Sequence, residues 1–185
     1  QTSQMGLANI KQQDIKKLPV FMGEADVIKS LQTMPGIKSY GDGSAYFYVR
    51  GGEKDQNLIL IDEAPIYNPS HLFGFFTSFS SDAIKDIEVY KTDIPVSKES
   101  GLSSLIDIKT KDGNMNHFAM KGGISPIASR ISIEGPLKKE KSSYFISSRR
   151  SNIEWFLLSQ DKAAYDIYFY DFIFINCIWI HFYFT

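Results

Sequence analysis

Tyr46-Phe47-Tyr48-Val49-Arg50-Gly51-Gly52 is a short run of strand-forming residues that ends in two glycines. A polar connection leads to a second apolar run, Leu58-Ile59-Leu60-Ile61, which Asp62-Glu63-Ala64-Pro65 closes as a turn. Aromatic and β-branched residues favour strands, and a Gly-containing polar connection between two such runs is typical of a hairpin. We therefore expect a hairpin-like pair of strands at the centre of a small sheet.

A helix is expected before this pair, between Gly23 and Met34. Its apolar residues recur at the spacing of one helical face: Val27, Ile28, Leu31 and Met34. Pro35-Gly36 follows, a pair that commonly ends helices. The segment is therefore predicted to be a short amphipathic helix that lies on the sheet.

Two further strands are expected after the pair. Ile87 to Lys91 alternates apolar and polar residues, and Leu105 to Thr110 is a second strand-like run. Ser80-Ser81-Asp82 offers an N-cap for one helical turn through Ala83 and Ile84. These signals predict that residues 18–114 form one α+β domain with a small mixed sheet and short helices.

Less regular segments border or interrupt this domain. Residues 1–17 are polar, and Ile10 and Ile15 are too sparse to define a buried face, which predicts a linker or a loose strand. Residues 66–76 are rich in aromatic side chains but are broken by Pro69 and Gly74, which favours an ordered loop.

The character of the chain changes after residue 116. Residues 118–134 predict a long strand whose last part alternates between an apolar and a more polar side. Gly135-Pro136 and the charged residues after it predict a turn, and Tyr144 to Arg150 and then Tyr165 to Phe174 predict two more antiparallel strands. Such alternation is typical of strands with lipid on one side and an aqueous lumen on the other. Soluble edge strands alternate too, so the pattern alone does not decide between them.

The last segment, residues 172–185, is almost wholly apolar and aromatic. It is too short to span a bilayer as a helix, and at a soluble terminus it would promote aggregation. We expect a truncated or frame-shifted hydrophobic tail after about Asp171. A lipid-facing strand is the alternative.

Composition and side-chain chemistry argue against several functions. A net charge of -1 without a Lys/Arg-rich stripe argues against nucleic acid as a partner. The single Cys177 excludes an internal disulfide and a Cys-based zinc site. His71, His117 and His181 are far apart and fit no spaced metal motif. We find no catalytic constellation, and we expect neither an enzyme nor a bound cofactor.

The order of these motifs resembles the plug domain of TonB-dependent outer-membrane receptors. The similarity runs through these segments: Leu18 to Ile37, Val49-Arg50-Gly51-Gly52, Leu58 to Asn68, Asp82 to Lys91, Gly101 and Leu105 to Thr110. The stretch Asn68 to Phe76 resembles a branch of the family found in Bacteroidetes. Three positions depart from the pattern. Asp62-Glu63 stands where many members carry Asp-Gly, Ser103-Ser104 where they carry Gly-Gly, and Lys91-Thr92-Asp93 where Arg-Gly-Pro is common.

The resemblance implies that residues 18–114 are a plug and residues 117–171 the first strands of its barrel, which here is incomplete. The implied function is gated uptake of a scarce solute, such as a siderophore, vitamin or oligosaccharide, across the outer membrane of a Gram-negative cell. TonB would drive the uptake, although no TonB-contacting box is convincing in residues 1–17.

The same resemblance implies roles for particular side chains. Arg50 would contact carboxylates on the barrel wall. The expected solute-facing residues of an apical loop are Tyr67, Asn68, His71 and Phe73. The plainer interpretations are a surface charge at a strand end for Arg50 and packing within the loop for the other four.

An alternative function is a soluble periplasmic binding or adaptor module that uses the same α+β domain. This hypothesis predicts a stable monomer in the absence of detergent.

Overall fold

A computed structural model describes residues 6–15, 17, 20–21, 24–41, 44–71, 76–96, 98, 102–152 and 168–178. The chain divides into two compact units. The first contains residues 1–21 and 25–110, and the second contains residues 22–24 and 111–185. No helix in the ranges given above is long and apolar enough to cross a membrane.

Short strands and helices make up the chain as far as Thr110. The helices are α1 (Gln12–Ile15), α2 (Val27–Gln32) and the 3-10 helix η1 (Lys54–Gln56). The strands are β1 (Leu7–Lys11), β2 (Val20–Phe21), β3 (Glu24–Ala25), β4 (Ile37–Ser39), β5 (Phe47–Val49), β6 (Asn57–Ile61), β7 (Ala64–Pro65), β8 (Ser70–His71), β9 (Phe76–Thr77), β10 (Ile84–Tyr90) and β11 (Ser104–Thr110).

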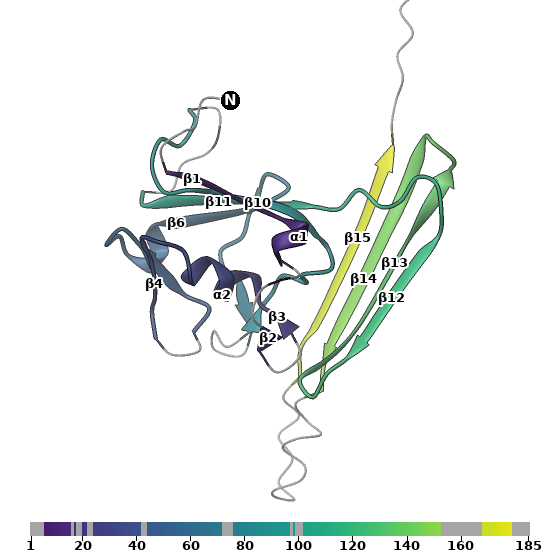
Figure 1. Ribbon diagram of the computed structural model, residues 1–185, viewed down its shortest axis with the longest axis horizontal. Coiled ribbons are helices and arrows are strands. Elements are labelled where there is room, and N and C mark those ends of the chain that lie inside the picture. Colours follow the sequence, from purple (N-terminus) through teal and green to yellow (C-terminus); the bar gives the residue numbers. More distant parts are fainter. Residues whose placement is uncertain are drawn as a thin grey trace, which may run out of the picture. The chain divides into compact units, whose positions relative to one another are not determined.

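A five-stranded sheet in the order β1-β10-β11-β6-β7 organises the first unit (Figure 1). β11 and β6 run parallel, whereas the β1–β10, β10–β11 and β6–β7 pairs are antiparallel. Three two-stranded sheets accompany it: β2-β3, β4-β5 and β8-β9. The expected α+β class with a mixed sheet and short helices is confirmed.

The core of the first unit lies between α2 and one face of this sheet. Val27, Ile28 and Leu31 of α2 are fully buried and pack in one cluster with apolar side chains of β6, β10 and β11. Asp26 caps the helix by accepting a hydrogen bond from the Lys29 amide at 3.1 Å. The predicted amphipathic helix is therefore present, although it begins at Val27 rather than near Gly23.

The two central runs are not paired with each other, so the expected hairpin is wrong. β5 pairs with β4, and β6 pairs with β11. The connection turns the chain away from β5 because Arg50 and Gly51 both adopt positive φ angles, of 50° and 84°, before η1 begins. The Asn57 side chain still ties the two runs together, since its amide donates to the Phe47 carbonyl at 2.9 Å.

Residues 7–15 are more ordered than the expected linker or loose strand. β1 pairs with β10 in the main sheet, and Ile10 and Ile15 are buried in the core. A few apolar residues are sufficient here because β1 is an edge strand and only part of it needs to be covered. The helical turn expected through Ala83 and Ile84 is not present. The chain makes a single tight turn there, in which the Ala83 amide donates to the Ser80 carbonyl at 3.0 Å, and β10 begins at Ile84.

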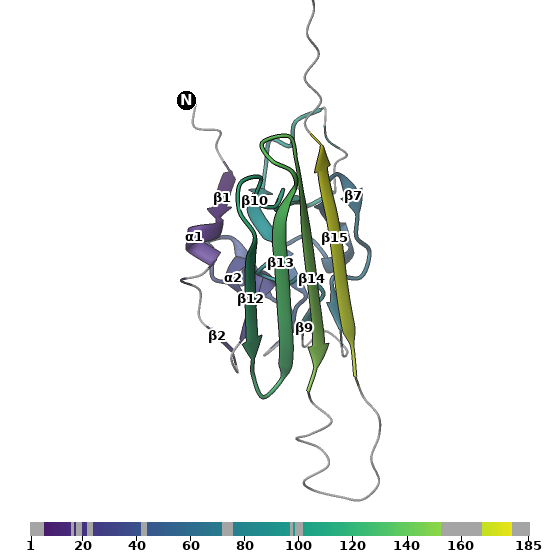
Figure 2. The ribbon, with the colours of Figure 1, turned by 90° about the vertical axis from the view of Figure 1, so that its right-hand side faces the viewer.

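The second unit contains a four-stranded antiparallel sheet, β12 (Ala119–Ile124), β13 (Ala128–Lys138), β14 (Ser142–Ser151) and β15 (Tyr170–Ile178), in chain order (Figure 2). Residues 118–134 are thus not one strand, because Ser125 makes a turn whose hydroxyl both accepts from the Ala128 amide and donates to the Ala128 carbonyl at 2.9 Å. Gly135-Pro136 lies inside β13, and the register shifts just after Pro136. The turn follows at residues 139–141.

β15 extends through part of the expected tail, because residues 172–178 continue the strand that begins at Tyr170. Two other expected features fall partly or wholly outside the described residues. These are the end of the tail, residues 179–185, and the start of the strand expected from Tyr165 to Phe174, of which residues 165–167 are not described.

The two faces of the four-stranded sheet differ in chemistry. One face exposes large apolar side chains: Met120, Ile124, Ile131, Tyr170, Phe172 and Phe174. On the other face the buried side chains include Ser143, Ser147 and Arg149, and the Arg149 Nε donates to Asp171 at 2.7 Å. A face of large exposed apolar side chains opposite a more polar one is the alternation expected of strands with lipid on one side.

Candidate functional site

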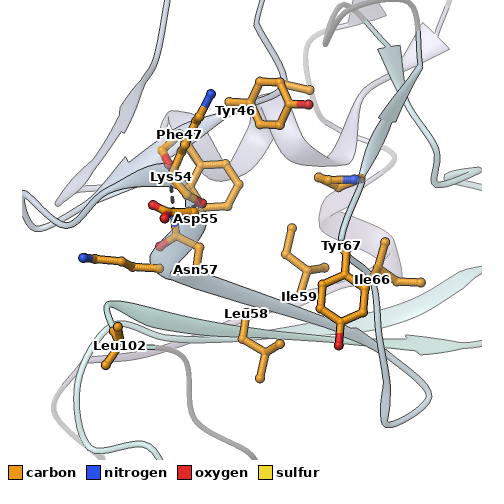
Figure 3. Close-up of a pocket in the computed structure, with 13 residues that line it drawn as sticks. Tyr46, Phe47, Lys54, Asp55, Asn57, Leu58, Ile59, Ile66, Tyr67 and Leu102 are labelled. Atoms are coloured by element: carbon orange, nitrogen blue, oxygen red, sulfur yellow. Dashed lines mark hydrogen bonds between the residues drawn. The ribbon is translucent and has the colours of Figure 1, made fainter.

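A pocket of about 500 Å³ opens in the first unit beside the connection that carries η1 (Figure 3). Its floor is apolar and its rim is polar or aromatic. The residues that line it are Ala45, Tyr46, Phe47, Lys54, Asp55, Gln56, Asn57, Leu58, Ile59, Ile66, Tyr67, Pro69 and Leu102. A concave surface with an apolar floor and a few polar groups is the usual form of a small-molecule site.

Hydrogen bonds inside the protein fix the two amide side chains that line the pocket. Asn57 donates to the Phe47 carbonyl and accepts from the Ser104 hydroxyl at 2.7 Å. The Gln56 side chain accepts from the Glu53 amide at 3.1 Å and thereby closes the N-terminus of η1. The two amide side chains therefore already have partners within the protein, and the other polar residues of the lining carry most of the groups that a bound molecule would meet.

The rim of the pocket pairs a cation with tyrosine rings. The Lys54 ammonium lies 5.0 Å from the centre of the Tyr40 ring and 5.3 Å from that of Tyr46, which are cation–π distances. Tyr40 also contacts Tyr48, with ring centres 5.5 Å apart. The charged residues that line the pocket are Lys54 and Asp55, so their formal charges cancel.

The residues predicted for an apical loop have different positions. Tyr67 is 91% exposed and lines the pocket. Asn68 is exposed, and its Oδ1 accepts from the Ser70 hydroxyl at 3.3 Å. His71 is half-buried in β8, where it pairs with Phe76 of β9. Phe73 lies outside the described residues, so of the other three only Tyr67 lines the pocket.

Sequence reasoning missed Tyr46, Lys54 and Leu102 as pocket residues. Tyr40, Tyr46 and Tyr48 form a dense aromatic group beside the glycine-containing residues 41–43, and such a group next to a polar connection is a signal for a binding surface. Leu102 carries no comparable signal, because it reaches the pocket only through the folding of residues distant in sequence.

Arg50 follows the end of β5 and is exposed, which fits both a contact with a neighbouring structure and a surface charge at a strand end. Its backbone amide donates to the Gly36 carbonyl at 3.0 Å. Within the described part of the chain, no carboxylate forms an ion pair with the Arg50 side chain.

A second cation lies near Arg50. The Lys91 ammonium donates to the Pro35 carbonyl at 2.6 Å. The pKa of Lys91 lies below its usual value because the group is partly buried and because the positive charge of Arg50 is close. Two neighbouring cations of this kind favour a partner that brings carboxylates.

The part of the chain that the structure describes contains no group of three or more His, Cys, Asp or Glu side chains arranged to hold a metal ion.

Comparison with known families places these features in context. The family model of the TonB-dependent receptor plug domain matches residues 1–101. This chain belongs to that family. The matched residues make up most of the first unit, which we call the plug from here on, and the match includes β1.

Solved outer-membrane receptors share the fold of the chain. The siderophore receptor PirA from Acinetobacter baumannii is similar with a TM-score of 0.57 and 23% identity, over 80% of this chain and 24% of that one. The outer-membrane transporter YddB from Escherichia coli is similar with a TM-score of 0.57 and 15% identity, over 79% of this chain and 26% of that one. The alcaligin outer-membrane receptor FauA from Bordetella pertussis is similar with a TM-score of 0.52 and 18% identity, over 81% of this chain and 28% of that one. The chain thus spans about a quarter of the length of these proteins. No match to the chain was found among curated proteins.

Proposed function

We propose that the chain is the plug and the first barrel strands of an outer-membrane transporter that takes up a scarce solute with energy delivered through TonB. The observation that carries this proposal is the sheet that follows the plug in sequence. Its exposed face bears Met120, Ile131, Phe172 and Phe174, which suits contact with lipid. A soluble adaptor module, the alternative, would gain nothing from such a face.

The cellular setting follows from the family. We infer a place in the outer membrane of a Gram-negative cell, with TonB and the rest of the chain's own barrel as partners. The stretch Asn68 to Phe76 favours the Bacteroidetes branch. Structures with the same fold are named as a siderophore receptor, a ferric yersiniabactin uptake receptor and a copper transporter, so a siderophore is one candidate solute beside a vitamin or an oligosaccharide.

The pocket of the plug is the proposed contact surface for the solute. Tyr67 supplies an exposed aromatic side chain at its rim, and Asn68, His71 and Phe73 follow it closely in the sequence. Aromatic rings and hydroxyl groups bind ring-shaped or hydroxylated molecules through stacking and hydrogen bonds. We therefore propose Tyr67 as a solute contact in the pocket, and Asn68, His71 and Phe73 as further contacts beside it.

Arg50 is the proposed contact between plug and barrel. Its exposed guanidinium, next to Lys91, would pair with carboxylates on the inner wall of the barrel. Such a pairing would hold the plug in place, because an Arg–carboxylate pair is strong and directional when it is shielded from water.

A leak assay tests the plug assignment in the complete transporter. Arg50→Ala is expected to raise the sensitivity of cells to an antibiotic too large for ordinary porins, because a loosened plug leaves the lumen open. Lys139→Ala, at an exposed turn, is the matched control and should leave sensitivity unchanged. An unchanged leak in both variants would exclude Arg50 as a plug–barrel contact.

A second measurement distinguishes the transporter from the soluble module. A chain that is a monomer in buffer without detergent would favour the soluble module.

Growth of cells in media that limit one nutrient at a time identifies the class of solute. Cells that depend on the transporter for iron, for a vitamin or for an oligosaccharide are compared in turn, and the limiting nutrient that requires the wild-type protein names the class. In that medium Tyr67→Ala should slow uptake at low solute concentration more than at high concentration. Equal uptake at every concentration would remove Tyr67 from the site.

A further inference from the structure

The apolar face of the four-stranded sheet changes its chemistry at one end, where β14 stops and β15 begins (Figure 2). Ser129, Arg150 and Tyr170 are direct neighbours there across β13, β14 and β15. Two residues further along their strands, Ile131 and Phe172 begin the band of exposed apolar side chains. A positive charge therefore lies at the margin of this apolar band.

Arg150 lies among aromatic rings at this margin. Its guanidinium carbon is 5.6 Å from the centre of the Tyr170 ring, a cation–π distance. The Tyr168 and Tyr170 rings meet edge to face, with their centres 5.4 Å apart. Arg150 is exposed, and the two tyrosines are 52% and 58% exposed. We refer to these three residues as the Arg150 cluster, whose charge and hydroxyl groups can be reached from outside the protein.

Hydrogen bonds hold the strand ends that carry the Arg150 cluster. The Ser129 hydroxyl donates to the Asn152 side-chain oxygen at 3.1 Å and accepts from the Asn152 side-chain amide at 2.8 Å. The Ser151 amide donates to the Phe169 carbonyl at 3.0 Å, and the Ser151 hydroxyl accepts from the Phe169 amide at 3.0 Å. Because Ser151 and Phe169 adjoin the cluster in sequence, these bonds fix the positions from which its side chains project.

The neighbouring Arg149 lies in a different environment. Successive side chains of a strand point to opposite faces, so Arg149 lies on the polar face of the sheet. Its side chain is 4% exposed there, and its Nε donates to Asp171. The apolar face includes no Asp or Glu at the described positions of β12 to β15, so its formal charge is positive. A negatively charged group would complement this end of the apolar face.

A membrane lipid with an anionic headgroup matches both parts of this surface. Arg side chains at the margin of the hydrocarbon lay their apolar stem along it while the charged end reaches the headgroups, and tyrosines gather at the same depth. A guanidinium offers two parallel donors to a phosphate, and a tyrosine hydroxyl is a further donor.

We propose that the Arg150 cluster binds the phosphate of an anionic lipid headgroup, while the acyl chains of that lipid lie along the apolar band. This inference rests on the lipid contact proposed above for the sheet. It adds to that contact a site for one class of lipid.

Partitioning of the full chain into lipid vesicles tests the site. The probes are vesicles of phosphatidylcholine alone and vesicles of phosphatidylcholine mixed with phosphatidylglycerol, whose headgroup carries a net negative charge. Arg150→Gln should lower the partition coefficient for the mixed vesicles about fivefold, because one Arg near an anionic surface contributes about that factor. For vesicles of phosphatidylcholine alone the coefficient should stay within about twofold of wild type, since these vesicles carry no net charge.

Lys121→Gln is the matched control. Lys121 of β12 is also exposed, but it pairs with the buried Ser132 and lies on the polar face of the same sheet. The same loss of charge there should leave both partition coefficients within about twofold of wild type. Arg150→Lys keeps the charge but loses the planar pair of donors, so it should recover less than half of the binding that Arg150→Gln loses.

Three results would overturn the proposal. These are an unchanged coefficient for the mixed vesicles in Arg150→Gln, an equal loss in Lys121→Gln, and full recovery in Arg150→Lys, which would mean that charge alone attracts the lipid. A wild-type chain that enters neither kind of vesicle would contradict the proposed lipid contact of the sheet itself. Equal partitioning of wild type and Arg150→Gln into both kinds would contradict the Arg150 cluster alone, so the two failures are distinguishable.

Discussion

Asp62 accepts a hydrogen bond from the Thr110 amide at 3.0 Å and a second from the Thr110 hydroxyl. Asp62 lies in the two-residue turn between β6 and β7, whereas Thr110 is the last residue of β11. One carboxylate therefore ties a turn to the end of the neighbouring strand. This role is structural and explains an acidic residue at the end of an apolar strand.

Replacement of Asp62 should weaken the plug. Asp62→Ala removes both acceptors and leaves the Thr110 amide without this partner, which we expect to lower the free energy of unfolding by about 1 kcal/mol. Thermal unfolding followed by circular dichroism measures the change. Asp55→Ala, at another exposed acidic residue, should change stability by much less, and an equal loss in both variants would contradict the assignment.

The residue after Asp62 offers a stabilising substitution. Asp62 and Glu63 have φ angles of 45° and 70°, and Ile61 pairs with Ala64 across them, the geometry of a two-residue hairpin turn that favours Asn-Gly or Asp-Gly. Glu63→Gly should raise the free energy of unfolding by about 0.5–1 kcal/mol, because glycine adopts a positive φ without steric cost. Glu63→Ala should give no such gain, and a loss of stability with glycine would refute the turn geometry.

A large cost is expected in the core. Leu31 of α2 is fully buried among the apolar side chains of the sheet. Leu31→Ala should lower the free energy of unfolding by about 2–5 kcal/mol, because it removes buried methyl groups and leaves a cavity. Leu102→Ala, at a side chain that is 89% exposed, is the matched control and should change stability by less than about 0.5 kcal/mol.

Local sequence patterns predicted the helices and strands of this fold better than they predicted which strands pair. The spacing of Val27, Ile28 and Leu31 identifies α2, and the alternation in β10 identifies a strand, because both signals lie within a few residues. The pairing of β6 with β11 depends on contacts between residues far apart in sequence, and β4 lies about as near to β5 along the chain as β6 does, so sequence distance does not decide which strand β5 pairs with. A short polar connection between two strands favours a hairpin but does not require one.

The same limit applies to the candidate site. Tyr67 lines the pocket as an exposed aromatic residue in a loop, which sequence suggested. Lys54 and Leu102 come to the pocket from separate segments, and only the folded sheet places them near Tyr67. The contact of Lys98 with Glu88 and Asp107 is hidden in the same way, because these two carboxylates become neighbours only through the β10–β11 register.

The exposed face of the second sheet should control association with lipid. Phe174 is 58% exposed on that face, and a lysine there would place a charge against hydrocarbon. Phe174→Lys should reduce recovery of the chain with floating phosphatidylcholine vesicles at least tenfold. Leu102→Lys makes a similar change on an exposed residue of the plug and should leave recovery unchanged. Equal recovery in all three proteins would argue against lipid contact by this face.

The Lys98 ammonium donates to Glu88 at 3.1 Å, and this contact should appear in the acid stability of the plug. Burial of Glu88 opposes its ionisation, but hydrogen bonds from Tyr90 and Lys98 outweigh burial and hold the pKa of Glu88 below its usual value of 4.5. Because the folded state lowers this pKa, the resulting stability is present above the unfolded pKa and is lost as the pH falls through the folded one. In wild type the free energy of unfolding should decrease as the pH falls from neutral into the acid range. In Lys98→Met this decrease should be smaller. Lys109→Met should reduce it less, since Lys109 is more exposed and farther from Glu88. Chemical denaturation at a series of pH values measures these slopes, and parallel slopes in all three proteins would show that Lys98 does not stabilise the ionised Glu88.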